Sequence, residues 1–247
     1  MNEIYGKGLE IFDKGLNELG IELTDDKKEQ FIKFYEMLIE KNKVMNLTAI
    51  TEFDEVIVKH FLDSLALVKI TGTEILESGI SIIDVGTGAG FPGIPIKIAF
   101  PQIRITLLDS LNKRINFLKE VSEELKIENI EFIHGRSEDL GKKPEYREKY
   151  DICVSRAVAN LATLSEFCIP FVKVGGQFIS YKAGDSGKEI KESTKAVDKM
   201  GGIIKETVEY MVPESDLSRV LLSIKKEKAT PKVFPRKAGT PAKEPIK

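Results

Sequence analysis

From about residue 80 onward, short β-branched runs alternate with helical patterns, and this alternation restricts the fold more than any other feature of the chain. Strands are predicted at Ser81–Val85, Ile103–Leu108, Asn129–Ile133, Asp151–Val154 and Gln177–Tyr181. Helices are predicted between and after them, at Phe91–Ala99, Asn112–Lys126, Asn160–Val172 and Lys188–Met200. Because strands separated by helices are joined by crossovers, the pattern predicts an α/β fold whose mostly parallel sheet is covered on both faces.

Two more strand patterns follow Gly201-Gly202, at Ile203–Met211 and Arg219–Lys225. The segment between them, Pro213–Ser218, is too short for a crossover, so we expect an antiparallel hairpin there. Seven strands that end in such a hairpin are typical of the class I, Rossmann-like methyltransferase fold rather than of the six-stranded dinucleotide fold.

The first 70 residues read as helices. Leu9, Phe12, Leu16 and Leu19 recur at helical spacing and Gly20 marks the end of that helix. Thr24 is a candidate N-cap for a second helix, and a third apolar stripe runs from residue 53 to 68. We therefore expect an N-terminal helical extension over residues 1–70, a nucleotide-binding domain over 71–228 and a basic tail over 229–247.

The composition favours a folded protein, and its cysteines favour the cytosol. Hydrophobic residues make up 42% of the chain, enough for a sizeable core. Cys153 and Cys168 lie in apolar segments, and no secretory signal is apparent, so reduced core thiols are expected. His60 and His134 are far apart and far from any cysteine pair with ligand spacing, which argues against a metal site.

The charge is distributed unevenly. The formal net charge of −2 argues against a general nucleic-acid binder. Residues 225–247, however, carry eight basic and two acidic side chains, a net +6, which leaves −8 on the rest. A tail that only aids solubility and a tail that binds anions are both compatible with this pattern.

The first predicted strand runs into a glycine loop, with Asp84 just before Gly86, Gly88 and Gly90. Glycines at the carboxyl end of a strand let the backbone turn tightly and approach a ligand closely. Gly88, Gly90 and Gly93 also match the spacing of a dinucleotide site, so a nicotinamide-dependent dehydrogenase is an alternative.

Neighbouring residues favour S-adenosylmethionine over a dinucleotide. An acid at Asp84 suits a cationic amino group and would oppose a pyrophosphate. Pro92 and Pro95 remove amide donors that a pyrophosphate would need. Asp109 ends the second strand, where a carboxylate can accept hydrogen bonds from ribose hydroxyls of either cofactor.

The third strand ends at Gly135-Arg136-Ser137-Glu138. Ser137 and Glu138 are placed to meet an adenine amino group. Alternatively, Ser137 caps the next helix and Glu138 lies in its first turn.

Candidates for the acceptor side follow the fourth and fifth strands. Arg156, in Ser155-Arg156-Ala157-Val158, offers forked donors for a phosphate, a carboxylate or a guanine edge, or it forms a salt bridge to a neighbouring acid. Lys182 is the next candidate at the same edge. His60 lies on an apolar stripe and reads as a core histidine, whereas Asp63 lies off that stripe and reads as a surface partner of Lys59.

These residues make the chain resemble the RsmG (also called GidB) family of bacterial methyltransferases that act on 16S ribosomal RNA. The resemblance covers nearly the whole chain. It rests on Asn46–Ile50, His60–Ser64, Asp84–Gly93, Asp109–Arg114, Ser155–Val158 and Phe234–Pro241. The glycine loop is widespread among methyltransferases, whereas the Arg-Ala-Val and Pro-Arg-Lys-Ala-Gly-Thr-Pro segments are far more specific.

The resemblance implies methylation of N7 of one guanosine in the decoding region of 16S RNA, by a cytoplasmic enzyme that works alone, as a monomer, or in a simple assembly. Residues expected to bind S-adenosylmethionine are Asp84, Gly86, Gly88, Phe91, Asp109, Ser137, Glu138 and Arg156. Arg156 and Lys182 are expected on the catalytic side. Basic residues expected to contact RNA are Lys225, Lys226, Lys232, Arg236 and Lys237. A ribosome-assembly factor without chemistry and a small-molecule methyltransferase remain alternatives.

Overall fold

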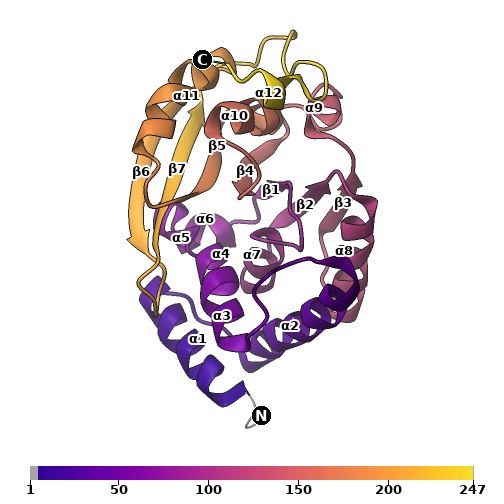
Figure 1. The fold of residues 1–247 in the computed structure, drawn as a ribbon, viewed down its shortest axis with the longest axis vertical. Coiled ribbons are helices and arrows are strands. Elements are labelled where there is room, and N and C mark those ends of the chain that lie inside the picture. Colours follow the sequence, from indigo (N-terminus) through magenta and orange to yellow (C-terminus); the bar gives the residue numbers. More distant parts are fainter. Residues whose placement is uncertain (1–4, 247) are drawn as a thin grey trace.

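A seven-stranded twisted sheet forms the centre of the computed structural model, which describes residues 5–246 (Figure 1). Its strands are β1 (Ser81–Val85), β2 (Arg104–Asp109), β3 (Ile130–His134), β4 (Tyr150–Arg156), β5 (Val172–Ala183), β6 (Gly202–Met211) and β7 (Ser218–Lys226). The order across the sheet is β3-β2-β1-β4-β5-β7-β6. All pairs from β3 to β5 are parallel, and β7 runs antiparallel to both β5 and β6, which confirms the predicted terminal hairpin.

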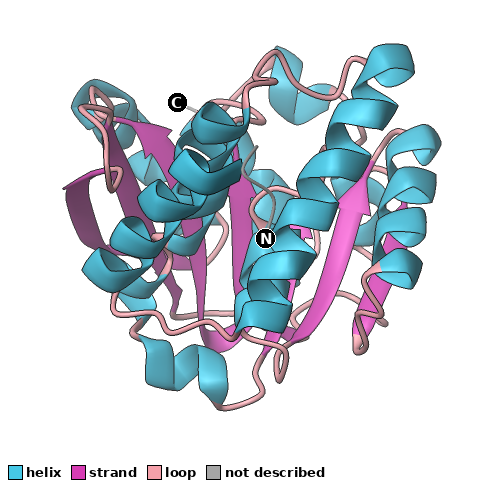
Figure 2. Ribbon diagram, turned by 90° about the horizontal axis from the view of Figure 1, so that it is seen from below, coloured by secondary structure: helices cyan, strands magenta, loops and turns pink. Residues whose placement is uncertain are grey.

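Helices cover both faces of this sheet (Figure 2). They are α1 (Gly6–Leu19), α2 (Asp25–Met45), α3 (Phe53–Val56), α4 (Asp63–Leu65), α5 (Val68–Thr71), α6 (Thr73–Glu77), α7 (Gly93–Ala99), α8 (Asn112–Glu124), α9 (Ser137–Leu140), α10 (Leu161–Cys168), α11 (Gly187–Lys199) and α12 (Thr240–Lys243). A π-helix, η2 (Ile57–Leu62), and a 3₁₀-helix, η3 (Ile169–Phe171), complete the set.

Residue alternation along the strands builds two hydrophobic cores. Ile82 and Leu107 face one side, against α7, α8 and the N-terminal helices. Their neighbours Ile83 and Leu108 face the other side, against α10 and α11. Because side chains in a strand alternate with a period of two, an uninterrupted apolar run is what a sheet covered on both faces requires.

The N-terminal helices pack into the first of these cores and not beside it. Phe12, Phe31 and Phe61 form a buried aromatic cluster that continues to Phe91 behind the glycine loop. Gly20 ends α1 in the left-handed conformation, as expected. Thr24 occupies the N-cap position of α2, but its side chain makes no capping hydrogen bond.

The predicted third helix is interrupted by the π-helix η2 at Ile57–Leu62. A π-helix takes more residues per turn than an α-helix, so positions after it are rotated relative to an ideal helical wheel. Asp63 is therefore buried, not on the surface, and the prediction that it pairs with Lys59 is wrong. Lys59 pairs instead with Glu55.

The chain between α10 and β5 also differs from expectation. The helix predicted to reach Val172 ends at Cys168, and Pro170 lies in the 3₁₀-turn that follows. Since proline cannot donate a helical hydrogen bond, the chain leaves the helix there. Val172 already belongs to β5, so this strand begins earlier than the predicted Gln177.

Candidate functional site

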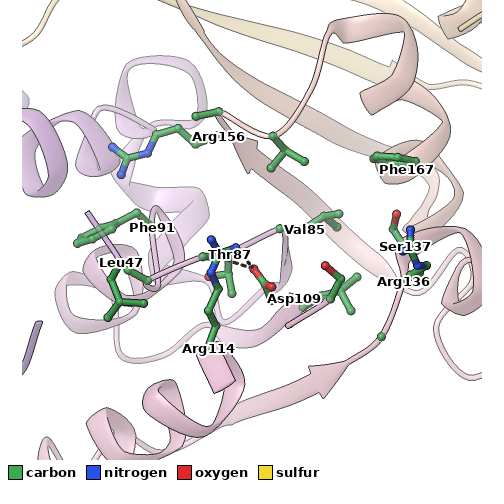
Figure 3. Close-up of a pocket in the computed structure, with 18 of the residues that line it drawn as sticks. Leu47, Val85, Thr87, Phe91, Asp109, Arg114, Arg136, Ser137, Arg156 and Phe167 are labelled. Atoms are coloured by element: carbon green, nitrogen blue, oxygen red, sulfur yellow. Dashed lines mark hydrogen bonds and ion pairs between the residues drawn. The ribbon is translucent and has the colours of Figure 1, made fainter. Parts of the chain in front are cut away.

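A cavity of about 480 Å³ opens at the carboxyl ends of β1 to β4, where ligands bind in open α/β sheets. In Figure 3, Phe91 and Arg156 lie on one side of it, Ser137 and Phe167 on the other, and Asp109 between them. Seven residues predicted to bind a cofactor line this one cavity: Gly86, Gly88, Phe91, Asp109, Ser137, Glu138 and Arg156. Residues far apart in the sequence thus meet at one site of a size that suits a small molecule.

The glycine loop forms the floor of the cavity. Gly86 and Gly88 have φ values of +75° and +61°, which L-residues with side chains rarely adopt. A Cβ atom on Gly86 would lie 2.6 Å from Val158 Cγ2, on the loop after β4. Glycine at this position therefore allows the β1 and β4 loops to approach where the sheet order reverses.

Asp84 lies beneath the loop and is not among the residues that line the cavity. Its Oδ2 accepts hydrogen bonds from the Thr87 hydroxyl at 2.7 Å and the Gly93 amide at 2.9 Å, while Oδ1 is buried without a partner. Burial raises the pKa of this carboxyl to about 7. Asp84 therefore supports the glycine loop and does not line the cavity, where the expected direct contact with a cationic ligand would be made.

The same contacts weaken the dinucleotide alternative. Gly93 is the first residue of α7, and its amide is already bonded to the Asp84 carboxylate. A pyrophosphate at this helix N-terminus would need such amides and would meet the Asp84 carboxyl group in their place.

Asp109 is buried at 2% exposure, lines the cavity and is held in a fixed orientation. Its carboxylate accepts from the amides of Gly88 at 3.0 Å and Leu111 at 2.8 Å, and Arg114 Nη1 lies 3.3 Å away. These three donors orient the carboxylate between the glycine loop and the start of α8, where it remains part of the cavity wall.

Ser137 and Glu138 form the far end of the cavity. Ser137 begins α9 and does not cap it, because Arg136 holds the N-cap position. The Ser137 hydroxyl lies 3.2 Å from Glu138 Oε2, and Glu138 Oε1 accepts from the Gly239 amide at 2.8 Å. The C-terminal segment thus reaches the cavity wall.

His60 lies in the wall of the cavity, in contrast to its predicted place in the core. Its ring stacks on Phe91 with 4.5 Å between centroids, and Nε2 lies 2.9 Å from Thr48 Oγ1. Burial, and then the positive charge of Arg156, lower the pKa of His60 to about 3. The imidazole is therefore neutral at physiological pH.

Arg156 is held by the buried acid that sequence reasoning placed on the surface. Its Nη1 donates to Asp63 Oδ2 at 2.7 Å and to the Lys59 carbonyl at 3.2 Å, and the guanidinium lies 5.2 Å from the Phe91 ring centroid. Tyr210 donates to the other oxygen of Asp63 at 3.0 Å. The salt-bridge alternative for Arg156 is thus present, and the side chain still borders the cavity.

A second cavity of about 690 Å³ adjoins the first and shares His60, Arg156 and Ala157 with it. Lys182 lies in this second cavity and not in the first, with its Nζ 2.7 Å from Glu189 Oε1. Lys59 and Arg219 also line it. Two compartments of different composition therefore meet at Arg156.

Two of the basic residues expected to contact RNA form ion pairs within the protein instead. Lys226 is 1% exposed, and its Nζ reaches Glu148, the Ile169 carbonyl and the Thr230 hydroxyl. Arg236 forms a bidentate pair with the buried Glu166. The prediction for Lys226 is wrong because charge in a sequence says nothing of burial.

The remaining three basic residues are accessible. Lys232 and Lys237 are exposed, and Lys225 is half-buried on β7 beside Glu227. The tail as a whole is packed onto α9 and α10 and is not a solvated extension, although Lys247 lies outside the described residues.

Sequence reasoning missed the contribution of the turn after α2. Asn46 leaves the helix in the left-handed conformation, and the Asn42 side chain accepts from the amides of Leu47 and Thr48. This turn brings Leu47 and Thr48 over the cavity. The Asn46–Ile50 motif was the only signal, because no periodicity links Thr48 to His60.

The residues that line the cavity fit S-adenosylmethionine. It combines a glycine floor that admits a closely approaching ligand, a carboxylate at Asp109 for hydroxyls and an acidic end at Glu138 for an amino group. Within residues 5–246 no cluster of three or more histidines, cysteines and acids is suited to a metal ion.

Comparison with known proteins identifies the family to which this chain belongs. A family model described as GidB, rRNA small subunit methyltransferase G, matches residues 27–217. Ribosomal RNA small subunit methyltransferase G of Lachnoclostridium phytofermentans is 51% identical over 235 residues, covering 95% of this chain and 96% of that protein. The protein of the same name from Acetivibrio thermocellus is 46% identical over 246 residues, with 100% of both chains covered.

Solved structures agree with the fold. A putative sarcosine dimethylglycine methyltransferase from Galdieria sulphuraria matches with a TM-score of 0.53 and 13% identity, over 71% of this chain and 88% of that one. TrmN from Thermus thermophilus matches with a TM-score of 0.50 and 14% identity, over 66% and 48%. At these identities the likeness establishes the fold alone. In the part of the chain that the structure describes, no helix is both long and apolar enough for a membrane crossing.

Proposed function

This chain belongs to the rRNA small subunit methyltransferase G family, and we propose that it transfers the methyl group of S-adenosylmethionine to N7 of one guanosine in the decoding region of 16S ribosomal RNA. The observation that carries the proposal is the pair of adjoining cavities. The one built on the glycine loop suits the cofactor. The other suits a nucleotide, because its cations outnumber its acids: it is lined by Lys59, Arg156, Lys182 and Arg219 and by Asp63 and Glu189.

The chemistry asks little of the protein beyond positioning. When bound, S-adenosylmethionine would supply a methyl group on a sulfonium: the lone pair of guanine N7 would form the new N–C bond while the C–S bond breaks, its electron pair would stay on sulfur, and S-adenosylhomocysteine would leave. N7 carries no proton, so no side chain must act as a base. Holding two reactants in line contributes roughly 7–11 kcal/mol to such a step.

The charges around the shared wall suit this reaction. Guanine becomes positively charged as N7 is methylated, so an uncompensated cation beside it would oppose the step. His60 is neutral because its pKa is lowered to about 3, and Asp63 offsets the charge of Arg156. The wall between the two cavities can therefore hold both ligands without opposing the charge that develops.

The exposed lysines near the C-terminus supply a candidate contact with RNA phosphates. Lys232 and Lys237 are exposed in the segment that borders the cofactor cavity at Gly239. The double variant K232A/K237A should weaken binding and reduce the slope of log affinity against log salt by about 0.7–0.9 for each phosphate interaction that is removed. An unchanged slope would show that these lysines do not contact RNA phosphates and serve only solubility.

The variant K226M tests the buried lysine instead. It should destabilise the fold, because Lys226 is 1% exposed and paired with Glu148.

We also propose that the protein acts as a monomer in the cytoplasm, where small ribosomal subunits are found. Sedimentation at micromolar concentration should give a mass near 27.6 kDa. A stable dimer would contradict that part of the proposal.

The function is tested by incubating the protein with methyl-labelled S-adenosylmethionine and small subunits that lack the modification. Label in 16S RNA is the expected result, with R156A reduced in turnover or in affinity for one ligand. Binding of NADH in place of S-adenosylmethionine would select the dehydrogenase, binding without transfer the assembly factor, and transfer to small molecules alone the third alternative.

A further inference from the structure

The last stretch of the chain, residues 230–246, is fixed to the body through charged side chains, and we call it the C-terminal segment. Arg147 donates to the carbonyls of Gly141 at 2.8 Å, Phe234 at 2.9 Å and Thr230 at 2.6 Å. Lys226, from β7, reaches the Thr230 hydroxyl at 2.7 Å. In Figure 1 the segment lies beside α9 and α10, at the opposite end of the molecule from α1.

Arg236 makes the bidentate attachment among these contacts. Its Nε and Nη2 bind both carboxylate oxygens of Glu166, at 2.8–3.1 Å, and its own amide donates to Glu166 Oε1. Glu166 lies on α10 and is 1% exposed. A bidentate pair of this kind combines charge with a fixed orientation. Its geometry specifies where the segment lies, whatever its net energy.

The same arginine closes a turn. Arg236 Nη2 also donates to the Glu244 carbonyl at 2.9 Å, and the Thr163 hydroxyl on α10 donates to the Pro241 carbonyl at 3.1 Å. The turn between residues 236 and 244 is thus held at both ends and at its middle.

This turn forms part of the cofactor cavity. Gly239 and Ala242 line it, and the Gly239 amide donates to Glu138 Oε1 at 2.8 Å. Glu138 is 3% exposed and is the acid expected to meet the adenine end of the cofactor. The carboxylate is therefore oriented by a backbone amide whose own position depends on Arg236.

We propose that Arg236, through Glu166, is a positioning residue for S-adenosylmethionine, and that the turn at 236–244 is a wall of the cofactor site. The inference rests on the proposed function for the identity of the cofactor and deepens it. Binding must then stabilise the turn, because coupling between two sites is reciprocal. Of two adjacent basic residues, Arg236 serves the cofactor, whereas Lys237 is exposed and free to contact RNA.

The test measures cofactor affinity without RNA, by calorimetry, in wild type, R236A, R236K and the control K243A. Lys243 lies in the same turn, but its side chain is exposed and does not line the cavity. R236A should weaken S-adenosylmethionine binding roughly 5- to 150-fold. R236K should fall between R236A and wild type, because lysine keeps the charge but not the forked donors. K243A should match wild type in this assay.

Two further readouts separate positioning from a merely structural role. In methyl transfer to small subunits, R236A should raise the KM for S-adenosylmethionine and leave the KM for the subunit unchanged. In the wild-type protein, S-adenosylmethionine alone should slow hydrogen exchange of the amides at 236–244, a measurement that needs no variant.

The inference is overturned if folded R236A binds S-adenosylmethionine as tightly as wild type, or if the cofactor leaves exchange at 236–244 unchanged. Wild-type protein that binds no S-adenosylmethionine would instead contradict the proposed function itself. The two failures are therefore distinguishable.

Discussion

Arg156 and Asp63 show how one buried ion pair ties three parts of the chain together. Asp63 comes from the N-terminal helices, Arg156 from the end of β4, and Tyr210 on β6 donates to the same carboxylate. Removing one partner of a buried pair leaves the other charge without compensation, which costs more than the pair contributes when intact.

Replacing Asp63 by asparagine should therefore be severe. The variant D63N keeps the shape of the side chain but leaves Arg156 unpaired, and we expect the free energy of unfolding to fall by about 3–5 kcal/mol. Urea denaturation measures this. The exposed pair of Lys7 and Asp54 gives a matched control, because D54N should cost only ~0–1 kcal/mol. Equal effects of the two variants would contradict the role given to Asp63.

Asp84 gives a pH-dependent prediction. Its pKa is raised by burial to about 7 in the folded protein, from the ordinary value of 3.8 for this side chain. The folded state thus holds this proton more tightly, so the contribution to stability is full below pH ~4 and is lost as the pH rises toward ~7.

The variant D84N cannot titrate, yet its side-chain oxygen can still accept from Thr87 and Gly93. The stability of D84N relative to wild type should therefore increase between pH 4 and 7, by at most ~1.4 kcal/mol per pH unit. Denaturant unfolding at several pH values measures the difference. A difference that stays constant with pH would show that Asp84 is already ionised in the fold.

For single residues, the sequence predicted which ones lie at the cofactor cavity better than it predicted which charged side chains are buried. Gly86, Asp109 and Ser137 could be placed in the cofactor cavity because each follows a predicted strand, and parallel strands end at one edge. The burial of Asp63 and Lys226 could not be predicted. That of Asp63 depends on the π-helix η2, and that of Lys226 depends on the packing of the C-terminal segment.

Among the elements, α1 illustrates why a helix can contain glycines. A Cβ atom on Gly15 would overlap the buried Leu62 side chain in η2, whereas one on Gly6 would meet no atom within 4 Å. Gly15 thus allows α1 to approach the π-helix that precedes Asp63.

Substitution by alanine separates these two glycines. Alanine is the better helix former by ~1 kcal/mol, so G6A should leave the melting temperature unchanged or raise it slightly. G15A should be destabilising despite the same propensity gain, since overpacking costs typically about 1–3 kcal/mol. Thermal denaturation of both variants checks this, and a G15A protein as stable as G6A would rule out close packing at that position.

The elements themselves were largely predictable, and their irregular parts were not. All seven strands follow from β-branched runs, and the terminal hairpin follows from the short turn at 213–218. The π-turn and the early start of β5 at Val172 leave no periodic signal. The early start of β5 follows from Pro170, which ends the preceding helix.

The whole molecule brings three stretches of chain to one cavity. Thr48 comes from the N-terminal helices, Gly86 from the sheet and Gly239 from the C-terminal segment. The nucleotide-binding sheet alone would leave the cavity without the walls that these outer stretches supply. Family membership and the adjoining second cavity are consistent with the proposed methyl acceptor, a guanosine in ribosomal RNA.

The most direct test of the proposed activity is to locate the methyl group. Small subunits that lack the modification are treated with the protein and S-adenosylmethionine, and their 16S RNA is cleaved chemically at N7-methylguanosine. We predict one new cleavage, at a single guanosine in the decoding region, that depends on both protein and cofactor. Cleavage at no guanosine, or methylation at another atom or in another RNA, would contradict the proposed activity.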